Sequence, residues 1–186
     1  MSLVPVREDD EVRAPRDSAR RALASGDRSS ARKALSGTGL LGRDVPFPVA
    51  LAVAEECGRA GAVSLVSGDL TLAAALLGSG EQLVVLGSAY ASRRCAFGRP
   101  LSRFQVQRHA FAFAAARLTG GRALIWRAAE FGDPMDLAAA LPEAADAAWF
   151  AAETVLQVHG ASGYCVGEIA ERWAQIARTR AGLQAR

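Results

Sequence analysis

The sequence predicts an all-α protein whose main part is a four-helix bundle. Alanine dominates the composition and β-branched residues are few, which favours helix over strand. From residue 69 onward, four long segments with helical periodicity are joined by short connections. Short connections make consecutive helices antiparallel neighbours, and four such helices form a bundle. Between Gly42 and Leu70 there is no series of alternating strands with turn signals.

Residues 1–65 are expected to form an N-terminal arm followed by short helices. Residues 1–14 are charged and are expected to be a loose arm, whereas 17–24 and 29–35 have the pattern of short helices. Residues 48–60 are also expected to be helical, with Glu55 and Glu56 facing outward.

The stretch 37–42, Gly-Thr-Gly-Leu-Leu-Gly, matches the G-x-G-x-x-G fingerprint of dinucleotide-binding folds. That fingerprint needs a strand before it and a helix that opens at its third glycine. Here a helical segment precedes it and Asp44-Val45-Pro46 follows. We therefore predict a loop between helices.

The bundle itself is assigned to residues 66–186. Its predicted helices cover residues 69–94, 102–130, 136–159 and 167–185. Asp69 is a natural N-cap, and Gly78 and Gly80 are expected to weaken the middle of the first helix. Gly120-Gly121 predict a kink or a close helix approach in the second helix, and Pro142 predicts a break or kink in the third.

Composition and charge limit the class of protein. Of the 186 residues, 51% are hydrophobic and 22% are charged, as expected for a folded soluble chain. The net charge of +3 is too small to indicate nucleic-acid binding, although it suits an anionic nucleotide or CoA ligand. Cys57, Cys95 and Cys165 are too widely spaced for a disulfide framework or a zinc site.

The same reading favours a cytoplasmic protein. The charged N-terminus is not a signal peptide, and no uninterrupted apolar run approaches the roughly 18 residues that span a bilayer. His109 and His159 stand alone, without a second histidine or a cysteine at ligand spacing, so no metal site is expected.

The connection between the first two bundle helices is rich in arginine. Arg93, Arg94, Arg99 and Arg103 surround a tight turn at residues 97–100. Each guanidinium offers a planar fork of donors and a permanent charge, so the group suits phosphate binding. A solvated corner with basic helix caps is the alternative.

Two motifs then point to a family. Residues 94–105 follow the pattern Arg-x-x-Phe-Gly-x-Pro-Leu-x-x-Phe-Gln, and residues 157–164 follow Gln-x-x-Gly-Ala-x-Gly-Tyr. In this order, joined by helical sequence, they resemble the C-terminal helical bundle domain of the acyl-CoA dehydrogenase family. Residues 39–63 resemble the end of the family's N-terminal helical domain. The family's middle β-domain is missing from this chain, so the chain looks like a truncated member.

The resemblance implies an FAD site shared between subunits, with FAD held largely by a partner and extended onto this bundle. Arg94 would contact the pyrophosphate, Phe97 would lie beside the flavin nucleotide, and Gln105 belongs to the same corner. Gln157, Gly160 and Gly163 would bring a side-chain amide and a close backbone to the dinucleotide. Alternatively, both motifs persist only as helix-corner geometry in a bundle that binds no flavin.

The family's catalytic base does not carry over. In the family, a carboxylate removes the α-proton of an acyl thioester while the β-hydride passes to flavin N5. Its usual position falls on Gln184, whose neutral amide cannot act as a general base. Some members place the carboxylate at the start of the bundle's first helix, where Asp69 is the candidate, with an N-cap as its other role. The family's Arg-Asp pair late in the fourth helix is replaced by Gln175-Ile176.

The leading hypothesis is an acyl-CoA dehydrogenase-like subunit that completes the FAD site of a full-length, base-bearing partner. The pair would oxidise an acyl thioester at Cα–Cβ. One alternative is a non-catalytic scaffold that self-associates through the bundle and has lost flavin. Another is a biosynthetic enzyme repurposed for different chemistry, with Asp69 as its catalytic residue.

Overall fold

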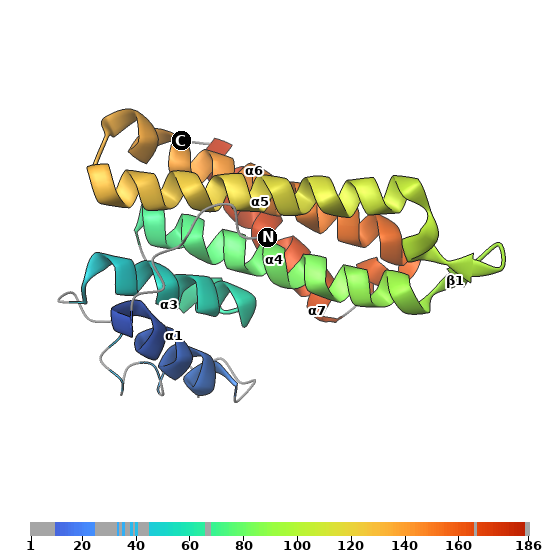
Figure 1. The fold of residues 1–186 in the computed structure, drawn as a ribbon, viewed down its shortest axis with the longest axis horizontal. Helices are drawn as coiled ribbons and strands as arrows, with labels where there is room; N and C mark the ends of the chain where they lie inside the picture. Colours follow the sequence, from blue (N-terminus) through green and yellow to red (C-terminus); the bar gives the residue numbers. More distant parts are fainter. Residues whose placement is uncertain are drawn as a thin grey trace.

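The computed structural model describes residues 10–24, 33, 35, 38, 40, 45–65, 68–165 and 167–184. The predicted all-α fold is confirmed. The four bundle helices are α4 (Asp69–Arg93), α5 (Gln105–Phe131), α6 (Pro134–His159) and α7 (Glu168–Gln184), close to the predicted segments. Consecutive helices run antiparallel, as the short connections required (Figure 1).

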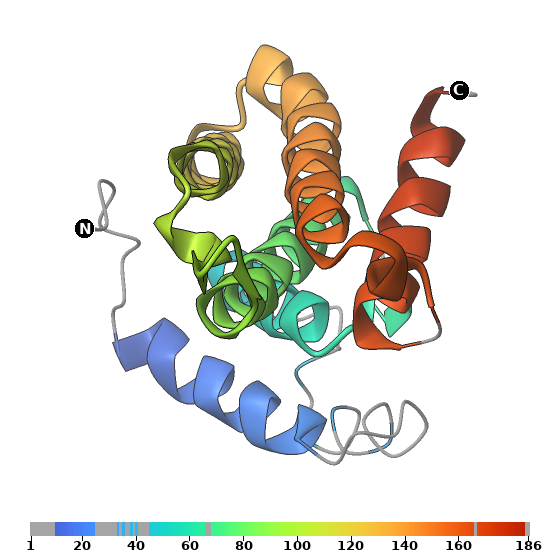
Figure 2. The same cartoon turned by 90° about the vertical axis from the view of Figure 1, so that its right-hand side faces the viewer.

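Helix α4 is the centre of the molecule. Figure 2 shows it surrounded by the other bundle helices and by α3 (Phe47–Arg59). Helix α4 is long and apolar enough to cross a membrane, although the sequence contains no long uninterrupted apolar run. However, 61% of its most apolar window is buried inside the protein. Its apolar character therefore follows from its place in the core.

Within the described residues, three elements precede the bundle. They are α1 (Asp10–Leu23), α3 and the 3-10 turn η1 (Val63–Leu65). Helix α1 starts earlier than expected, so the end of the predicted arm is helical and Pro15 lies inside a helix. The expected helix at 29–35 and the glycine-rich stretch 37–42 lie mostly outside the described residues.

Helix α3 connects this N-terminal part to the bundle by burying two faces. Leu51 and Ala54 belong to the core of the bundle, whereas Val53 and Cys57 pack with residues of α1. A helix that is apolar on both sides is buried on both sides.

The crossing of α3 and α4 depends on glycine. A Cβ atom on Gly78 would overlap the backbone carbonyl of Glu55, and one on Gly58 would overlap the carbonyl of Ala75. On Gly80 a Cβ would lie 2.8 Å from a methyl group of Leu118. The expectation that Gly78 and Gly80 merely weaken α4 is therefore wrong, because they let neighbouring helices approach.

The other helix signals had mixed outcomes. Helix α5 continues through its glycine pair, and Gly121 approaches α4 so closely that an added Cβ would lie 3.1 Å from a methyl carbon of Leu77. Helix α6 continues through Pro142 without a break. The predicted N-cap at Asp69 is wrong, because Gly68 occupies the cap position and Asp69 is the first helical residue.

Candidate functional site

The arginine-rich connection forms a small hairpin rather than a simple helix corner. Helix α4 ends at Arg93, and strands β1 (Cys95–Ala96) and β2 (Arg99–Pro100) pair antiparallel. The N–H of Leu101 donates to the carbonyl of Arg94 at 2.8 Å and closes the hairpin. A 3-10 turn, η2 (Leu101–Arg103), then leads into α5. The hairpin projects beyond the helices at one end of the bundle (Figure 1).

Phe97 at the tip of the hairpin combines backbone strain with exposure. Phe97 and Gly98 have φ values of 52° and 76°, the positive values of a type I′ hairpin turn. Phe97 is the only non-glycine residue with positive φ in the described part of the chain, and its side chain is 96% exposed. A bulky residue rarely adopts this conformation without a compensating role. The tip therefore presents its ring outward.

The second motif forms the loop that follows α6. His159 ends the helix, and the 3-10 turn η3 (Gly160–Tyr164) follows. Gly160 has φ 60° and ψ −144°, a conformation that glycine accommodates best. At Gly163 a Cβ would lie 2.9 Å from the Cβ of His159, so only glycine fits there without rearrangement.

The structure brings the two motifs to the same end of the bundle. The ring of Tyr90, near the end of α4, stacks on the ring of His159 with centroids 4.0 Å apart. The Nδ1 atom of His159 lies 2.8 Å from the carbonyl oxygen of Val155, and this contact orients the ring. Sequence reasoning assigned no role to this pair, and its two members are separated by two helices in the sequence.

The side chains at this end are available to a ligand. Arg94, Gln105 and Gln157 are exposed, and Arg94 has no ion pair among the described residues. The loop after α6 also helps to line a shallow cleft of about 180 Å³, together with Leu86 of α4 and Glu168 of α7. The arrangement can bind an anion at the surface, but it does not enclose one.

The two candidate base positions lie at the opposite end. Asp69 starts α4, and a helix of 25 residues places it about 37 Å from the hairpin end, at 1.5 Å per residue. Gln184 is the last residue of α7 and lies at the same end as Asp69, because α7 runs antiparallel to α6 (Figure 1). Asp69 is exposed, and Ile176, where the family has a polar residue, is fully buried in the core.

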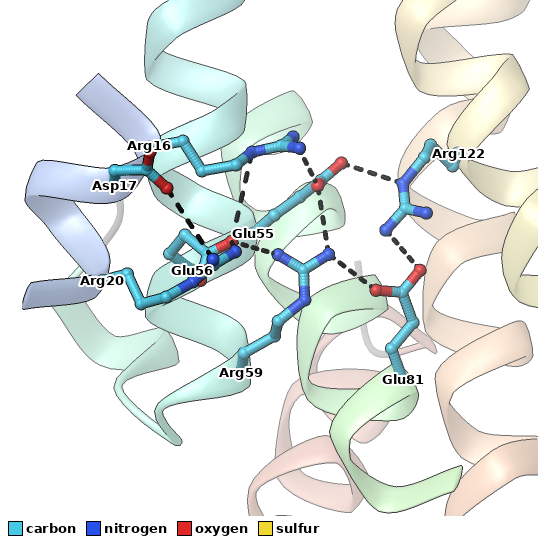
Figure 3. A network of polar contacts seen from close by, with 8 residues as sticks. All are labelled: Arg16, Asp17, Arg20, Glu55, Glu56, Arg59, Glu81 and Arg122. Carbon is cyan, nitrogen blue, oxygen red and sulfur yellow. Dashed lines mark hydrogen bonds and ion pairs between the residues drawn. The ribbon is translucent and has the colours of Figure 1, made fainter. Parts of the chain in front are cut away.

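A buried cluster of charges, which we call the arginine–glutamate network, lies where α1 and α3 meet the bundle (Figure 3). The prediction that Glu55 and Glu56 face outward is wrong, since they are 2% and 3% exposed. The network consists of Arg16, Asp17, Arg20, Glu55, Glu56, Arg59, Glu81 and Arg122.

Ion pairs neutralise the carboxylates of this network. Glu55 accepts from Arg16 Nη2 and from Arg122 Nε, both at 3.1 Å. Arg59 Nη2 donates to Glu81 at 2.7 Å. Because several guanidiniums occupy these carboxylates, the network is suited to joining helices rather than to acid–base catalysis.

The fold and the two motifs define an all-α bundle domain, and comparison with known proteins shows its family. Residues 63–183 match the family model described as acyl-CoA dehydrogenase, C-terminal domain. Because this match covers more than half of the sequence, the chain belongs to the acyl-CoA dehydrogenase family.

The curated relatives include two enzymes whose names give different activities. The 3-sulfinopropanoyl-CoA desulfinase of Paraburkholderia xenovorans (strain LB400) is 35% identical over 114 residues, or 59% of this chain and 29% of that protein. The mitochondrial short-chain specific acyl-CoA dehydrogenase of Homo sapiens is 33% identical over 120 residues, or 62% of this chain and 29% of that protein. The chain thus spans less than a third of the length of these relatives.

Solved structures agree on the fold. A glutaryl-coenzyme A dehydrogenase in complex with glutaryl-CoA matches with a TM-score of 0.54 and 22% identity, covering 74% of this chain and 33% of that one. The butyryl-CoA dehydrogenase of Megasphaera elsdenii matches with a TM-score of 0.53 and 25% identity, covering 72% of this chain and 34% of that one.

The residues present fit one part of FAD. At the hairpin end, an exposed guanidinium and exposed amides face solvent beside a glycine-rich loop, which suits a pyrophosphate. At the other end, Gln184 and the exposed Asp69 provide no dry, base-bearing pocket for the flavin ring. The chemistry of this donor set therefore fits the phosphate part of the dinucleotide and not its reactive part.

Proposed function

We propose that this chain is an acyl-CoA dehydrogenase-like subunit that completes the FAD site of a base-bearing partner subunit. The complex would oxidise an acyl thioester at Cα–Cβ. The observation that carries the proposal is the convergence of both motifs at one exposed end, which the Tyr90–His159 stack holds together.

Each residue at this end has a definable task. Arg94 would donate to the pyrophosphate, and the exposed ring of Phe97 would cover the nucleotide. Gln105 and Gln157 would donate or accept hydrogen bonds at the rim, and the backbone at the exposed Gly160 would be open to the ligand. The buried Gly163 would let the loop pack closely against the end of α6. When bound, FAD supplies the acceptor for the hydride that leaves Cβ. The α-proton must be removed by a carboxylate of the partner, because Gln184 has no basic oxygen of comparable strength.

A second candidate function is a different reaction on an acyl thioester, catalysed by a repurposed member of the family. Two observations favour keeping it: Gln184 occupies the usual base position, and one relative is named as a desulfinase. Asp69 would be its catalytic residue. This candidate receives less support, because Asp69 is exposed at the end of the bundle that lacks both motifs.

Co-purification from the native host tests the proposal. We expect a yellow complex that contains this chain, a full-length acyl-CoA dehydrogenase subunit and FAD. In that complex, Arg94→Ala should weaken FAD retention by roughly 1–3 kcal/mol, the usual cost of a lost charged hydrogen bond. Equilibrium dialysis with FAD, read by flavin absorbance, measures this change.

The matched control is Arg178→Ala. Arg178 is an exposed arginine on α7 without an ion pair among the described residues, so its loss should leave FAD retention unchanged. A colourless homo-oligomer that stays colourless after soaking in FAD would contradict the proposal and favour the scaffold alternative.

A further inference from the structure

A buried arginine of α7 reaches across the molecule to the N-terminal part of the chain. Arg172 is only 5% exposed. Its Nη1 atom donates to the carbonyl oxygen of Gly58 at 2.9 Å, and its Nη2 atom donates to the carbonyl oxygen of Arg59 at 2.5 Å. These carbonyls lie 114 and 113 residues earlier in the sequence, so the contact belongs to the tertiary structure alone.

The two hydrogen bonds close the C-terminal end of α3. The last carbonyls of a helix have no partner within the helix, and they carry the negative end of its dipole. Helix α3 ends at Arg59, so the guanidinium of Arg172 meets both the carbonyl oxygens and the partial charge of that end. Gly61, with φ 74°, turns the chain past the guanidinium, whose central carbon would lie 3.7 Å from a Cβ atom there. Arg172 therefore caps α3 from a distant helix.

A carboxylate near the second motif holds the other side of the same guanidinium. Oε1 of Glu168 accepts from Nε of Arg172 at 3.0 Å and from Nη2 at 2.8 Å. Among the described residues, Glu168 is the only ion-pair partner of Arg172. Glu168 is the first residue of α7, four positions after Tyr164 at the end of η3, and it helps to line the shallow cleft beside that loop.

These contacts form one continuous connection from α3 to the second motif, which we call the α3–α7 latch. It consists of the carbonyls of Gly58 and Arg59, the guanidinium of Arg172 and the carboxylate of Glu168. A buried guanidinium with several acceptors cannot move without leaving a charge unpaired. Because the connection between η3 and α7 is short, a fixed first turn of α7 also fixes the place where η3 ends.

We infer that Arg172 is a positioning residue for the loop of the second motif, residues 160–164. Through the α3–α7 latch, it holds this loop in the place where the backbone at the exposed Gly160 meets a ligand. The inference rests on the proposed function in one respect, since the ligand is taken to be the dinucleotide. It gives the N-terminal part of the chain a task, because α3 supplies the fixed point to which the loop is tied.

A general role in stability is the alternative, and a second link to α3 allows the two roles to be separated. Arg59 donates to Glu81 of α4 at 2.7 Å, so this pair also holds the end of α3 on the bundle. Glu81 lies nine residues before Tyr90, the residue of α4 that stacks on His159, which is about 13 Å along the helix. Loss of the pair should therefore loosen α3 without reaching residues 160–164.

Amide hydrogen exchange of the purified full chain, read by mass spectrometry on peptides, tests the inference. Arg172→Gln should raise the exchange rate about tenfold or more at residues 56–62 and at residues 160–165, and leave α5 unchanged. The control Glu81→Gln should raise exchange at 56–62 and leave 160–165 like wild type. Arg178→Gln, at an exposed position of the same helix as Arg172, should leave both segments unchanged.

Two results of this experiment would overturn the inference. One is fast exchange of Arg172→Gln at 56–62 alone, and the other is equally fast exchange at 160–165 in Glu81→Gln. If Arg172→Gln does not fold, Arg172→Lys decides, because lysine keeps the charge but lacks the planar fork that meets two carbonyls and a carboxylate together. Exchange at 160–165 like wild type in Arg172→Lys would then refute the positioning role.

FAD retention in the co-purified complex links the loop to its ligand. Arg172→Gln should weaken retention about tenfold more than Glu81→Gln does, because a loosened loop must be ordered again when the ligand binds. Fast loop exchange with unchanged FAD retention overturns the inference and leaves the proposed function in place. A colourless complex contradicts the proposed function, whereas the exchange rates of the chain alone still support or overturn the placement of the loop by Arg172.

Discussion

At the scale of single residues, Cys57 shows how burial changes chemistry. Its thiol is fully buried between α1 and α3, whereas Cys95 and Cys165 are exposed. Burial in apolar surroundings, reinforced by the negative charge of Glu56, raises the pKa of the Cys57 thiol to about 12. Because the thiolate is the reactive form, Cys57 is inert in the folded protein.

We predict that Ellman's reagent titrates two thiols in the native chain at pH 8 and a third only after denaturation. The raised pKa also predicts a pH effect on stability. The stabilising contribution is fully present below the pKa of about 9 in the unfolded chain, and is lost progressively as pH rises toward about 12. The free energy of unfolding should fall in this window by up to about 1.4 kcal/mol per pH unit.

Urea unfolding at several pH values measures this decline, and Cys57→Ala provides the comparison. If the variant loses stability with pH as steeply as wild type between pH 9 and 12, another group is responsible.

At the scale of elements, glycines decide how closely helices pack. Helix propensity alone predicts that Gly78→Ala stabilises α4 by about 1 kcal/mol. The structure predicts the opposite sign, because the new methyl group would overlap the backbone carbonyl of Glu55 in α3. Backbone cannot yield as a flexible side chain can, so we expect a loss of about 3 kcal/mol or more, from separation of the two helices.

Gly120→Ala in α5 is the matched control. It lies in a helix interior with no neighbour within 4 Å of the added methyl group, so stability should rise by about 0.5–1 kcal/mol. Thermal unfolding followed by circular dichroism compares the two variants. Equal effects of the two substitutions would show that α3 does not pack against Gly78.

At the scale of the whole molecule, the arginine–glutamate network joins four helices, α1, α3, α4 and α5, through buried ion pairs (Figure 3). Glu55→Gln would remove the charge that Arg16, Arg59 and Arg122 share. Within the described part of the chain, the guanidiniums would then have only Glu56 and Glu81 as counter-charges. Removing one of the buried carboxylates that they share should cost about 2–4 kcal/mol, after allowance for their residual exposure to solvent.

An exposed pair provides the contrast. Arg180 donates to Asp146 at 2.7 Å, but their side chains are 32% and 48% exposed. Asp146→Asn should therefore change stability by no more than about 1 kcal/mol. Urea unfolding of both variants tests the difference, and a Glu55→Gln variant as stable as Asp146→Asn would mean that the network does not hold the helices together.

Local signals were sufficient for much of the fold. Periodicity and short connections predicted all four bundle helices, and Gly132-Asp133-Pro134 shows why the ends were readable. Gly132 has φ 65° after α5, Asp133 accepts from the N–H of Met135 at 2.8 Å, and Pro134 opens α6. These residues end or start a helix through contacts within a few positions of the chain, so their effect does not depend on where the helix packs in the fold.

The sequence by itself therefore determined the helices, their order and the two motifs that identify the family. Only the tertiary structure decided that Glu55 and Glu56 face inward, because their direction depends on arginines that α1 and α5 supply from distant positions. It also decided that Gly78 is a packing residue rather than a weak point, since its neighbour belongs to another helix. The convergence of Tyr90 with His159, and the separation of both motifs from Asp69 and Gln184, follow from antiparallel packing of long helices. These contacts between distant helices depend on which helix faces bury apolar surface together, so no local sequence pattern predicts them.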